Sequence, residues 1–277
     1  MTRVLALCAD DFGAGAAIDE AIVALVRQGR LSEVSCISNG PSWAAGAAAL
    51  MAVPAVQEGR VRVGLHWNLT EGRPASPALA AHWPRLPALP RLIALAHLGR
   101  LPLAALRAEL DAQWQSFERH AGQPPAHLDG HQHVHHLPGL RRLVQARALA
   151  QPALRVRDTG RVRGPGFGVK RALIAATGGC ALGRWLRAQG RGANRELLGV
   201  YDFRDPDYRG LMRRWLARLP PAGGLIFCHP ALAEQPGDPI AAARCREWAY
   251  LAGEDFAADL AAAGVSLAGR QDGPRGT

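Results

Sequence analysis

The stretch "RVLALCADDFGAGAAIDEAIVALVRQG", residues 3–29, contains one complete strand-then-helix unit. An apolar run of strand length ends at two adjacent aspartates, Asp10 and Asp11, and apolar residues at helical spacing then continue to Gly29. A buried strand followed by a helix that ends at glycine is typical of α/β proteins with a parallel sheet. This first unit therefore places two carboxylates at the carboxyl end of a strand.

The same alternation continues along the chain and predicts the fold. Helical patterns separate further strand-like segments, which are EVSCISNG (33–40), RVRVGLHWNLT (60–70), AHLDGHQHVH (126–135), ALRVRD (153–158), ELLGVYDF (196–203), GGLIFCHPAL (223–232) and GVSLAG (264–269). Seven or eight such units without a break in composition predict an α/β fold, a TIM-barrel-like (β/α) barrel of parallel strands. We expect residues 1–277 to form a single domain.

One segment does not follow the alternation. Residues 82–102, "HWPRLPALPRLIALAHLGRLP", lie between the third predicted strand and its helix and are rich in proline and leucine. Proline removes backbone donors and disfavours regular helix. We expect an inserted flap at about 82–102 that overhangs the site and covers an extended or lipid-linked substrate. A homodimer contact or plain packing is the alternative interpretation.

Composition narrows the class of protein. Of the 277 residues, 48% are hydrophobic and 20% are charged, which is ordinary for a soluble globular protein. No apolar run reaches the roughly 18 residues needed to span a bilayer, and the first residues do not resemble a signal peptide. The five cysteines are scattered and odd in number, which indicates free thiols. These features predict a cytoplasmic location.

The formal net charge of +10 raises the question of an anionic partner. Lys170 is the only lysine, so the basic residues are otherwise arginines, a bias that fits GC-rich coding. No basic run with interleaved aromatic residues is present, and we predict no nucleic-acid binding. A solvated basic surface is the main interpretation, and attraction to an anionic substrate or peripheral contact with lipid headgroups is the alternative.

Polar residues gather where the predicted strands end. "HLDGHQHVHH", residues 127–136, holds five of the ten histidines, and His66 and His229 lie late in two other strands. In (β/α) barrels the carboxyl ends of the strands carry the catalytic side chains. On a regular strand Asp129, His131 and the two histidines that follow at alternate positions share one face. His66 and His131 are therefore both expected to point into the mouth of the barrel.

Two imidazoles and one carboxylate are a common ligand set for a divalent ion that keeps open positions for water and substrate. Either Asp10 or Asp11 completes that set, and the other accepts a proton from bound water. Adjacent residues of a strand point to opposite faces, so this division needs a break in the strand, which Gly13 permits.

Four motifs, "ADDFG", "GLHWNLTEGRP", "HLDGHQHVHHLP" and "FCHPAL", resemble those of the YdjC-like family of carbohydrate deacetylases, the ChbG/HpnK type. The resemblance covers residues 3 to about 268. It implies a TIM-barrel-like fold, one divalent metal ion (Mg²⁺ or Zn²⁺), and removal of an N-acetyl group from an amino sugar. It further implies that Asp11, His66 and His131 bind the metal and that Asp10 is the general base. In the same resemblance, His229 stabilises or protonates the reacting group from the side opposite the base.

Three further residues are expected around that centre. Asp129 is expected to orient a ligand imidazole, Asn68 to lie on the same strand face as His66, and Arg155 to bind a sugar hydroxyl or phosphate. Other classes stay open on these residues alone: a metal-dependent phosphoesterase or glycosidase, a non-haem iron oxygenase with two histidines and one carboxylate, and a non-catalytic metal- or nucleic-acid-binding protein. The expected substrate is an N-acetylated saccharide or a lipid-linked amino sugar.

Overall fold

The fold is known from a computed structural model, which describes residues 2–269. Its strands are β1 (Arg3–Phe12), β2 (Glu33–Cys36), β3 (Arg62–Trp67), β4 (His127–Gly130), β5 (Arg155–Val156), β6 (Leu197–Leu198), β7 (Gly224–Cys228) and β8 (Val265–Leu267). Its α-helices are α1 (Ala16–Arg27), α2 (Trp43–Met51), α3 (Pro54–Gln57), α4 (Pro77–His82), α5 (Leu89–His97), α6 (Leu103–Ala121), α7 (Leu140–Ala150), α8 (Gly168–Ile174), α9 (Cys180–Gln189), α10 (Tyr208–Ala217), α11 (Ala241–Ala252) and α12 (Glu254–Ala262). A 3₁₀ segment, η1 (His131–His136), and a π-helical turn, η2 (Ala175–Gly179), complete the set.

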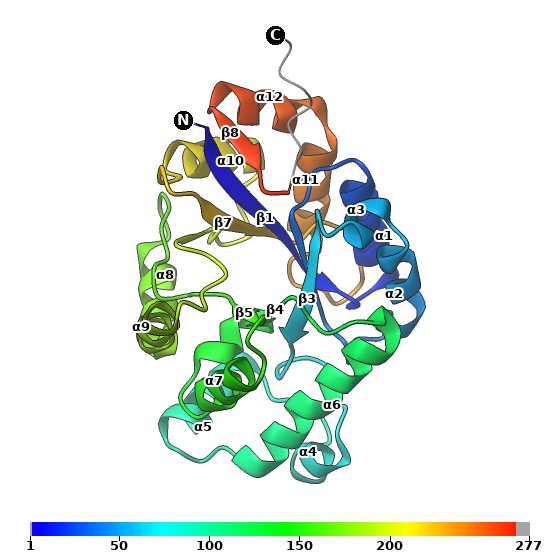
Figure 1. Ribbon diagram of the computed structural model, residues 1–277, viewed down its shortest axis with the longest axis vertical. Helices are drawn as coiled ribbons and strands as arrows, with labels where there is room; N and C mark the ends of the chain where they lie inside the picture. Colours follow the sequence, from blue (N-terminus) through cyan, green and yellow to red (C-terminus); the bar gives the residue numbers. More distant parts are fainter. Residues whose placement is uncertain (1, 270–277) are drawn as a thin grey trace.

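The strands form one parallel sheet in the order β5-β4-β3-β2-β1-β7-β6, and β8 pairs with the first residues of β1. The sheet curls, and the helices lie around its outside (Figure 1). This confirms the predicted α/β barrel-like fold. Its closure is incomplete, because in residues 2–269 no ladder joins β5 to β6. Instead, single bridges join Val156 to Gly192 and Val162 to Leu197.

Burial on both faces explains why these strands are almost continuously apolar. Leu5, Leu7 and Phe12 of β1 are fully buried, and so are Leu65 and Trp67 of β3. Strands covered by helices outside and by side chains inside bury both faces, so their sequences lack the polar alternation of exposed sheets. The exceptions at the strand ends are the polar groups that form the site.

The histidine run does not continue β4 as a strand. Strand β4 ends at Gly130, and the chain continues into η1, where Gln132 (φ 53°) and His133 (φ 61°) have left-handed backbone. A Cβ at position 130 would lie 2.8 Å from the backbone nitrogen of His135, so only glycine allows this close return of the chain. The expectation that alternate histidines share one strand face is therefore wrong beyond His131.

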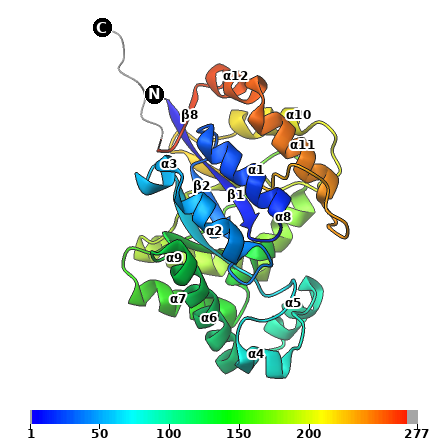
Figure 2. The same cartoon turned by 90° about the vertical axis from the view of Figure 1, so that its right-hand side faces the viewer.

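Residues 82–102 are more regular than expected. Helix α5 begins at Leu89 with Pro90 in its first turn, where proline replaces a donor that has no helical partner. Trp83, Leu86 and Leu92 are buried, and Figure 2 shows α4 and α5 together beside α6. The prolines thus start a helix instead of preventing one, and the segment packs against the domain.

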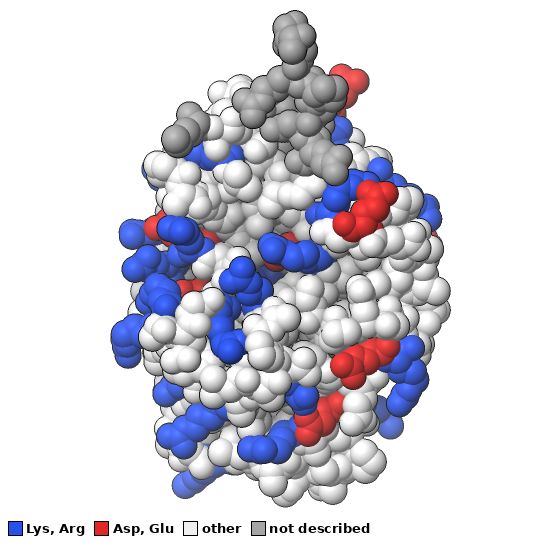
Figure 3. Space-filling model, in the orientation of Figure 1, with Lys and Arg blue, Asp and Glu red and all other residues white. Residues whose placement is uncertain are grey.

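Three further features are the absence of a membrane-spanning helix among the described residues, the state of the cysteines and the distribution of surface charge. In the part of the chain that is described, no helix has the length and apolarity to cross a membrane. All five cysteines lie in that part and none forms a disulfide. On the face in Figure 3, basic side chains are most frequent over the half that carries α8 and α9, with acidic groups among them.

Candidate active site

A break in β1 brings two adjacent carboxylates to one cavity. Asp11 has left-handed backbone (φ 71°), and the pairing with β2 shifts register between Ala9 and Phe12. The bulge turns the second aspartate so that Asp10 and Asp11 both line a cavity of about 520 Å³. The break occurs at Asp11 itself, and Gly13 (φ 96°) continues the irregular backbone.

Asp11, His66 and His131 meet at the floor of this cavity. Each offers one ligand atom, and the three atoms lie within 4.8 Å of one another. Nε2 of His66 lies 3.4 Å from Oδ1 of Asp11, and Nδ1 of His131 lies 2.8 Å from the same oxygen. The three residues come from β1, β3 and the start of η1. One carboxylate and two imidazoles in this arrangement fit a divalent cation.

Asp129 fixes the ring of His66. Nδ1 of His66 lies 2.6 Å from Oδ1 of Asp129, and because a carboxylate only accepts, the imidazole nitrogen is the donor. Nε2 is thereby left to face Asp11. Burial by itself would lower the pKa of His66, but the carboxylates of Asp129 and Asp10 raise it to about 10. This carboxylate–imidazole pair is the arrangement that orients histidine ligands in metal sites.

Glu71 lies on the other side of His131. Its Oε1 is 3.0 Å from Nε2 of His131, while Nδ1 of His131 donates to Asp11. Burial would lower the pKa of His131, yet the charge of Asp11, the hydrogen bond to Asp11 and the nearby carboxylate of Glu71 raise it to about 9. The proximity of His131 in turn lowers the pKa of Glu71. The carboxylates around His66 and His131 therefore favour the protonated forms of both imidazoles.

Two buried arginines balance the carboxylates. Arg157 donates to both oxygens of Asp10 at 2.7 Å and lies 2.6 Å from Oδ2 of Asp129. Arg244 of α11 donates to Oδ2 of Asp11 at 2.7 Å and to Asp238 at 2.6 Å. Burial would raise the pKa of Asp11, but the charges of His131 and Arg244 hold it well below its ordinary value. These charges thus favour the ionised form of Asp11.

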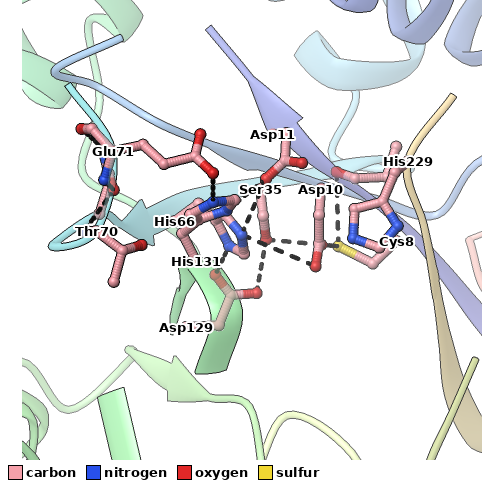
Figure 4. Close-up of polar contacts among 12 residues, drawn as sticks. Cys8, Asp10, Asp11, Ser35, His66, Thr70, Glu71, Asp129, His131 and His229 are labelled. Atoms are coloured by element: carbon pink, nitrogen blue, oxygen red, sulfur yellow. Dashed lines mark hydrogen bonds and ion pairs between the residues drawn. The ribbon is translucent and has the colours of Figure 1, made fainter. Parts of the chain in front are cut away.

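His229 lines the same cavity from the opposite side. It follows the last residue of β7, and in Figure 4 the carboxylates of Asp10 and Asp11 lie between its imidazole and those of His66 and His131. The rings of Phe203 and Phe227 pack in T-shaped contacts with it, with centroids 5.3 and 5.6 Å away. A reacting group in the cavity would therefore have carboxylates and candidate metal ligands on one side and an imidazole on the other.

The structure does not bring every expected residue to the cavity. Arg155, expected to bind a sugar hydroxyl or phosphate, is exposed on β5 and lines a different surface hollow, away from this cavity. The side chain directed inward is that of Arg157, two residues later. Asn68 is buried outside the cavity, where its Oδ1 accepts from the backbone of Thr70 and Glu71 and shapes the turn that carries Glu71.

The remaining histidines of η1 have different environments. His135 is buried, its Nε2 lies 3.0 Å from the backbone carbonyl of Arg157, and burial lowers its pKa to about 4. His136 contacts the hydroxyls of Thr159 and Thr177, and burial lowers its pKa as well. Only His133 joins His131 in lining the cavity. Most of the run therefore packs as neutral imidazole.

Sequence reasoning missed several residues around the site. Arg157 could have been found, because it is a charged residue at the end of an apolar strand like the aspartates. Arg244, Glu247 and Tyr201 carried no comparable signal. The sequence of α11 resembles that of an ordinary surface helix. Only the packed structure shows that Arg244 is 6% exposed and Glu247 0% exposed.

The fold and this cavity define a class: parallel α/β barrel proteins with a carboxylate–imidazole centre at the carboxyl ends of their strands. A model of the family described as YdjC-like protein matches residues 4–262, and the chain belongs to the YdjC-like family. A candidate cellobiose-phosphate cleavage protein from Enterococcus faecalis V583 has a similar structure, with a TM-score of 0.71 over 97% of each chain and 20% identity. At that identity the likeness supports the fold alone.

Curated relatives in other organisms are similar over part of their length. A carbohydrate deacetylase from Homo sapiens is 35% identical over 195 residues, which cover 68% of this chain and 53% of the human protein. A carbohydrate deacetylase from Mus musculus is 39% identical over 144 residues, 49% of this chain and 44% of the mouse protein. A chitooligosaccharide deacetylase from Enterobacter sp. (strain 638) is 33% identical over 151 residues, 52% of this chain and 55% of that protein. The matches thus span about half the length of these relatives.

Proposed function

We propose that this protein removes the N-acetyl group from an amino sugar by metal-dependent hydrolysis. The observation that carries the proposal is the geometry of Asp11, His66 and His131, whose ligand atoms lie within 4.8 Å of one another. These residues lie beside Asp10 and across the cavity from His229. Membership of the YdjC-like family and the names of the human and bacterial relatives support the same reaction.

The donor set supports one divalent cation, held by Asp11, His66 and His131. Two imidazoles favour Zn²⁺, whereas a site with more oxygen ligands favours Mg²⁺, so both ions belong in the test. When bound, such an ion lowers the pKa of water and polarises a carbonyl oxygen. The orientation of His66 by Asp129 supports this assignment, because the partner acid fixes which imidazole nitrogen faces the ion.

The chain's own residues divide the proton transfers. Asp10, fixed by Arg157 at both oxygens, accepts a proton from the attacking water. The water oxygen forms the new bond to the acetyl carbon, and the carbon–nitrogen bond breaks. The nitrogen takes a proton from His229 on the opposite side, so that acetate and a free amine leave.

The rim of the cavity supports a substrate larger than a single sugar. Leu89 from the 82–102 segment, Leu173 and Ile174 of α8, and Ile240 all line it. Val169 of α8 is 86% exposed beside them. We propose an extended or lipid-linked N-acetylated saccharide, with residues 82–102 as a fixed wall that covers it and α8 near any lipid surface.

The direct test is acetate release from the metal-loaded protein. N-acetylated monosaccharides, chitooligosaccharides and lipid-linked amino sugars are compared after chelation and return of Zn²⁺ or Mg²⁺. We expect release that depends on the returned ion. Phosphate or reducing-sugar release in place of acetate would identify a phosphoesterase or a glycosidase and refute the proposal.

A further inference from the structure

Glu247 is a fully buried carboxylate directly behind His229. It lies on α11, is 0% exposed and does not line the cavity. Its Oε2 accepts the backbone N–H of His229 at 2.5 Å, and its Oε1 accepts the hydroxyl of Tyr201 at 2.5 Å. Both oxygens are therefore bound to residues of the cavity wall, one at β7 and one after β6.

The charge of Glu247 has one basic partner among the described residues. In residues 2–269 no lysine or arginine nitrogen lies within 4.0 Å of its oxygens, whereas Nδ1 of His229 lies 3.9 Å from Oε1. That Nδ1 is itself buried and has no hydrogen-bond partner. A buried carboxylate without a cation is costly, and the protonated imidazole of His229 is the group placed to compensate it.

The other neighbours of His229 offer no alternative. Phe203 and Phe227 lie T-shaped to the ring and carry no formal charge, and Arg244 directs Nη1 to the backbone carbonyl of His229 at 3.5 Å. A guanidinium has the same sign of charge as an imidazolium and does not stabilise it. Among these neighbours, Glu247 is the group that supplies a negative charge.

We propose that Glu247 is a positioning residue for His229: it fixes the backbone at the end of β7 and supplies the negative charge that stabilises the protonated imidazole, while Tyr201 holds the carboxylate in place. The inference rests on the proposed role of His229 in protonating the leaving amine. It predicts that Glu247 matters only where the leaving group needs a proton.

Two substrates separate this role from a structural one. An N-acetylated chitooligosaccharide such as N,N′-diacetylchitobiose releases an amine that needs a proton, whereas 4-nitrophenyl acetate releases a phenolate that does not. For Glu247→Gln in the metal-loaded protein we expect kcat on the amide to fall roughly 10²-fold, the lower end for positioned acid–base help. KM, metal content and ester hydrolysis should stay close to those of the parent protein.

Three companion variants complete the experiment. His229→Ala should show the same split between amide and ester with a larger loss. Glu109→Gln is the matched control, because Glu109 is also a 0% exposed carboxylate that accepts backbone N–H groups, but outside the cavity; it should show no split. Tyr201→Phe keeps the charge of Glu247 and removes one hydrogen bond, so a smaller loss confined to the amide is expected, and this variant carries the test if Glu247→Gln does not fold.

The outcomes discriminate between the two proposals. Equal losses on amide and ester in Glu247→Gln, or no loss on either, would overturn the inference while a split in His229→Ala leaves the proposed function standing. If His229→Ala hydrolyses the amide at the parent rate, the acid assignment fails and the role of Glu247 fails with it. Loss of metal from Glu247→Gln would assign Glu247 a structural role and likewise overturn the inference.

Discussion

The two sides of the cavity are built on different electrostatic plans. On the side of β1, β3 and β4, the site carboxylates contact Arg157, Arg244 and two imidazoles. On the side of β6 and β7, His229 lies among aromatic rings with the single carboxylate of Glu247 behind it. The first side holds several charges in a fixed geometry, and the second side carries the ring that donates one proton in the proposed mechanism.

Two histidines of η1, His131 and His135, likewise differ in the charges that surround them. Carboxylates raise the pKa of His131 to about 9, whereas burial lowers that of His135 to about 4. These residues are four positions apart and both are buried. The number of histidines in a segment therefore says little about metal binding, and the carboxylates that face each ring say much more.

The largest effect is expected from removing a candidate ligand. Asp11→Ala, His66→Ala and His131→Ala should each lose bound metal and reduce acetate release to background, because two ligands do not retain the ion at a working concentration. Metal analysis and circular dichroism check binding and folding together. Full metal occupancy in His131→Ala would remove that residue from the ligand set, and His133 would be the next candidate.

A somewhat smaller effect is expected at Asp10. Asp10→Asn preserves the shape but cannot accept a proton, so turnover should fall roughly 10²–10⁴-fold while the metal stays bound. Steady-state kinetics and metal analysis on one sample measure both quantities. If the metal is lost as well, the roles of Asp10 and Asp11 are the reverse of those proposed.

Asp129 tests how strongly the β4 side orients its ligand. Asp129→Asn removes the carboxylate that fixes His66 and also leaves Arg157 with one carboxylate fewer. We expect metal affinity to fall roughly 10–100-fold, the usual range for a group that orients a ligand. Calorimetric titration of the metal measures it, and unchanged affinity would show that His66 needs no such support.

The raised pKa values predict opposite pH effects on folding and on metal binding. The ordinary histidine value is 6.5, and the folded values of His66 and His131 are about 10 and about 9. Their contribution to the stability of the metal-free protein is therefore complete below about pH 6.5 and is lost as the pH rises through 9 and 10. Metal binding displaces these protons, so metal affinity should rise over the same range.

Thermal unfolding of the chelated protein between pH 6 and 10 measures the first effect, and metal titration at each pH measures the second. His66→Gln is the matched variant, since it removes one titrating ring. A melting temperature of the parent protein that does not fall above pH 8 would contradict the assignment of charge to these rings.

The smallest effect is expected at the rim. Leu89 lines the cavity, while Leu92, one turn further along α5, is fully buried. Leu89→Ala should raise KM several-fold for an extended or lipid-linked substrate and leave small N-acetyl sugars unaffected, because only the larger substrate reaches this wall. Leu92→Ala is the control: it should lower the melting temperature without separating the substrates. An equal change in KM for both substrate sizes would remove Leu89 from a substrate-covering role.

The periodicity of the sequence predicts the repeat of the fold and one side of the site. Strand-then-helix alternation indicates parallel strands, and the carboxyl ends of parallel strands meet at one rim. Asp10, Asp11, His66, His131 and His229 each end or follow an apolar strand, so the sequence alone predicts that they lie together. The motif "ALRVRD" contains both Arg155 and Arg157, and only the structure shows that Arg157 is the one that contacts the site.

The remaining features of the site depend on packing between elements, which no local pattern encodes. The left-handed backbone of Asp11 directs the carboxylates of Asp10 and Asp11 toward the same cavity. The chain returns close to Gly130, and this return separates His131 from the later histidines of the run. Arg244 and Glu247 come from α11, with Arg244 233 residues from Asp11 in sequence, and their partners exist only after packing. Periodicity reports which face of an element is buried, whereas the charge and protonation of a buried group depend on neighbours from other elements.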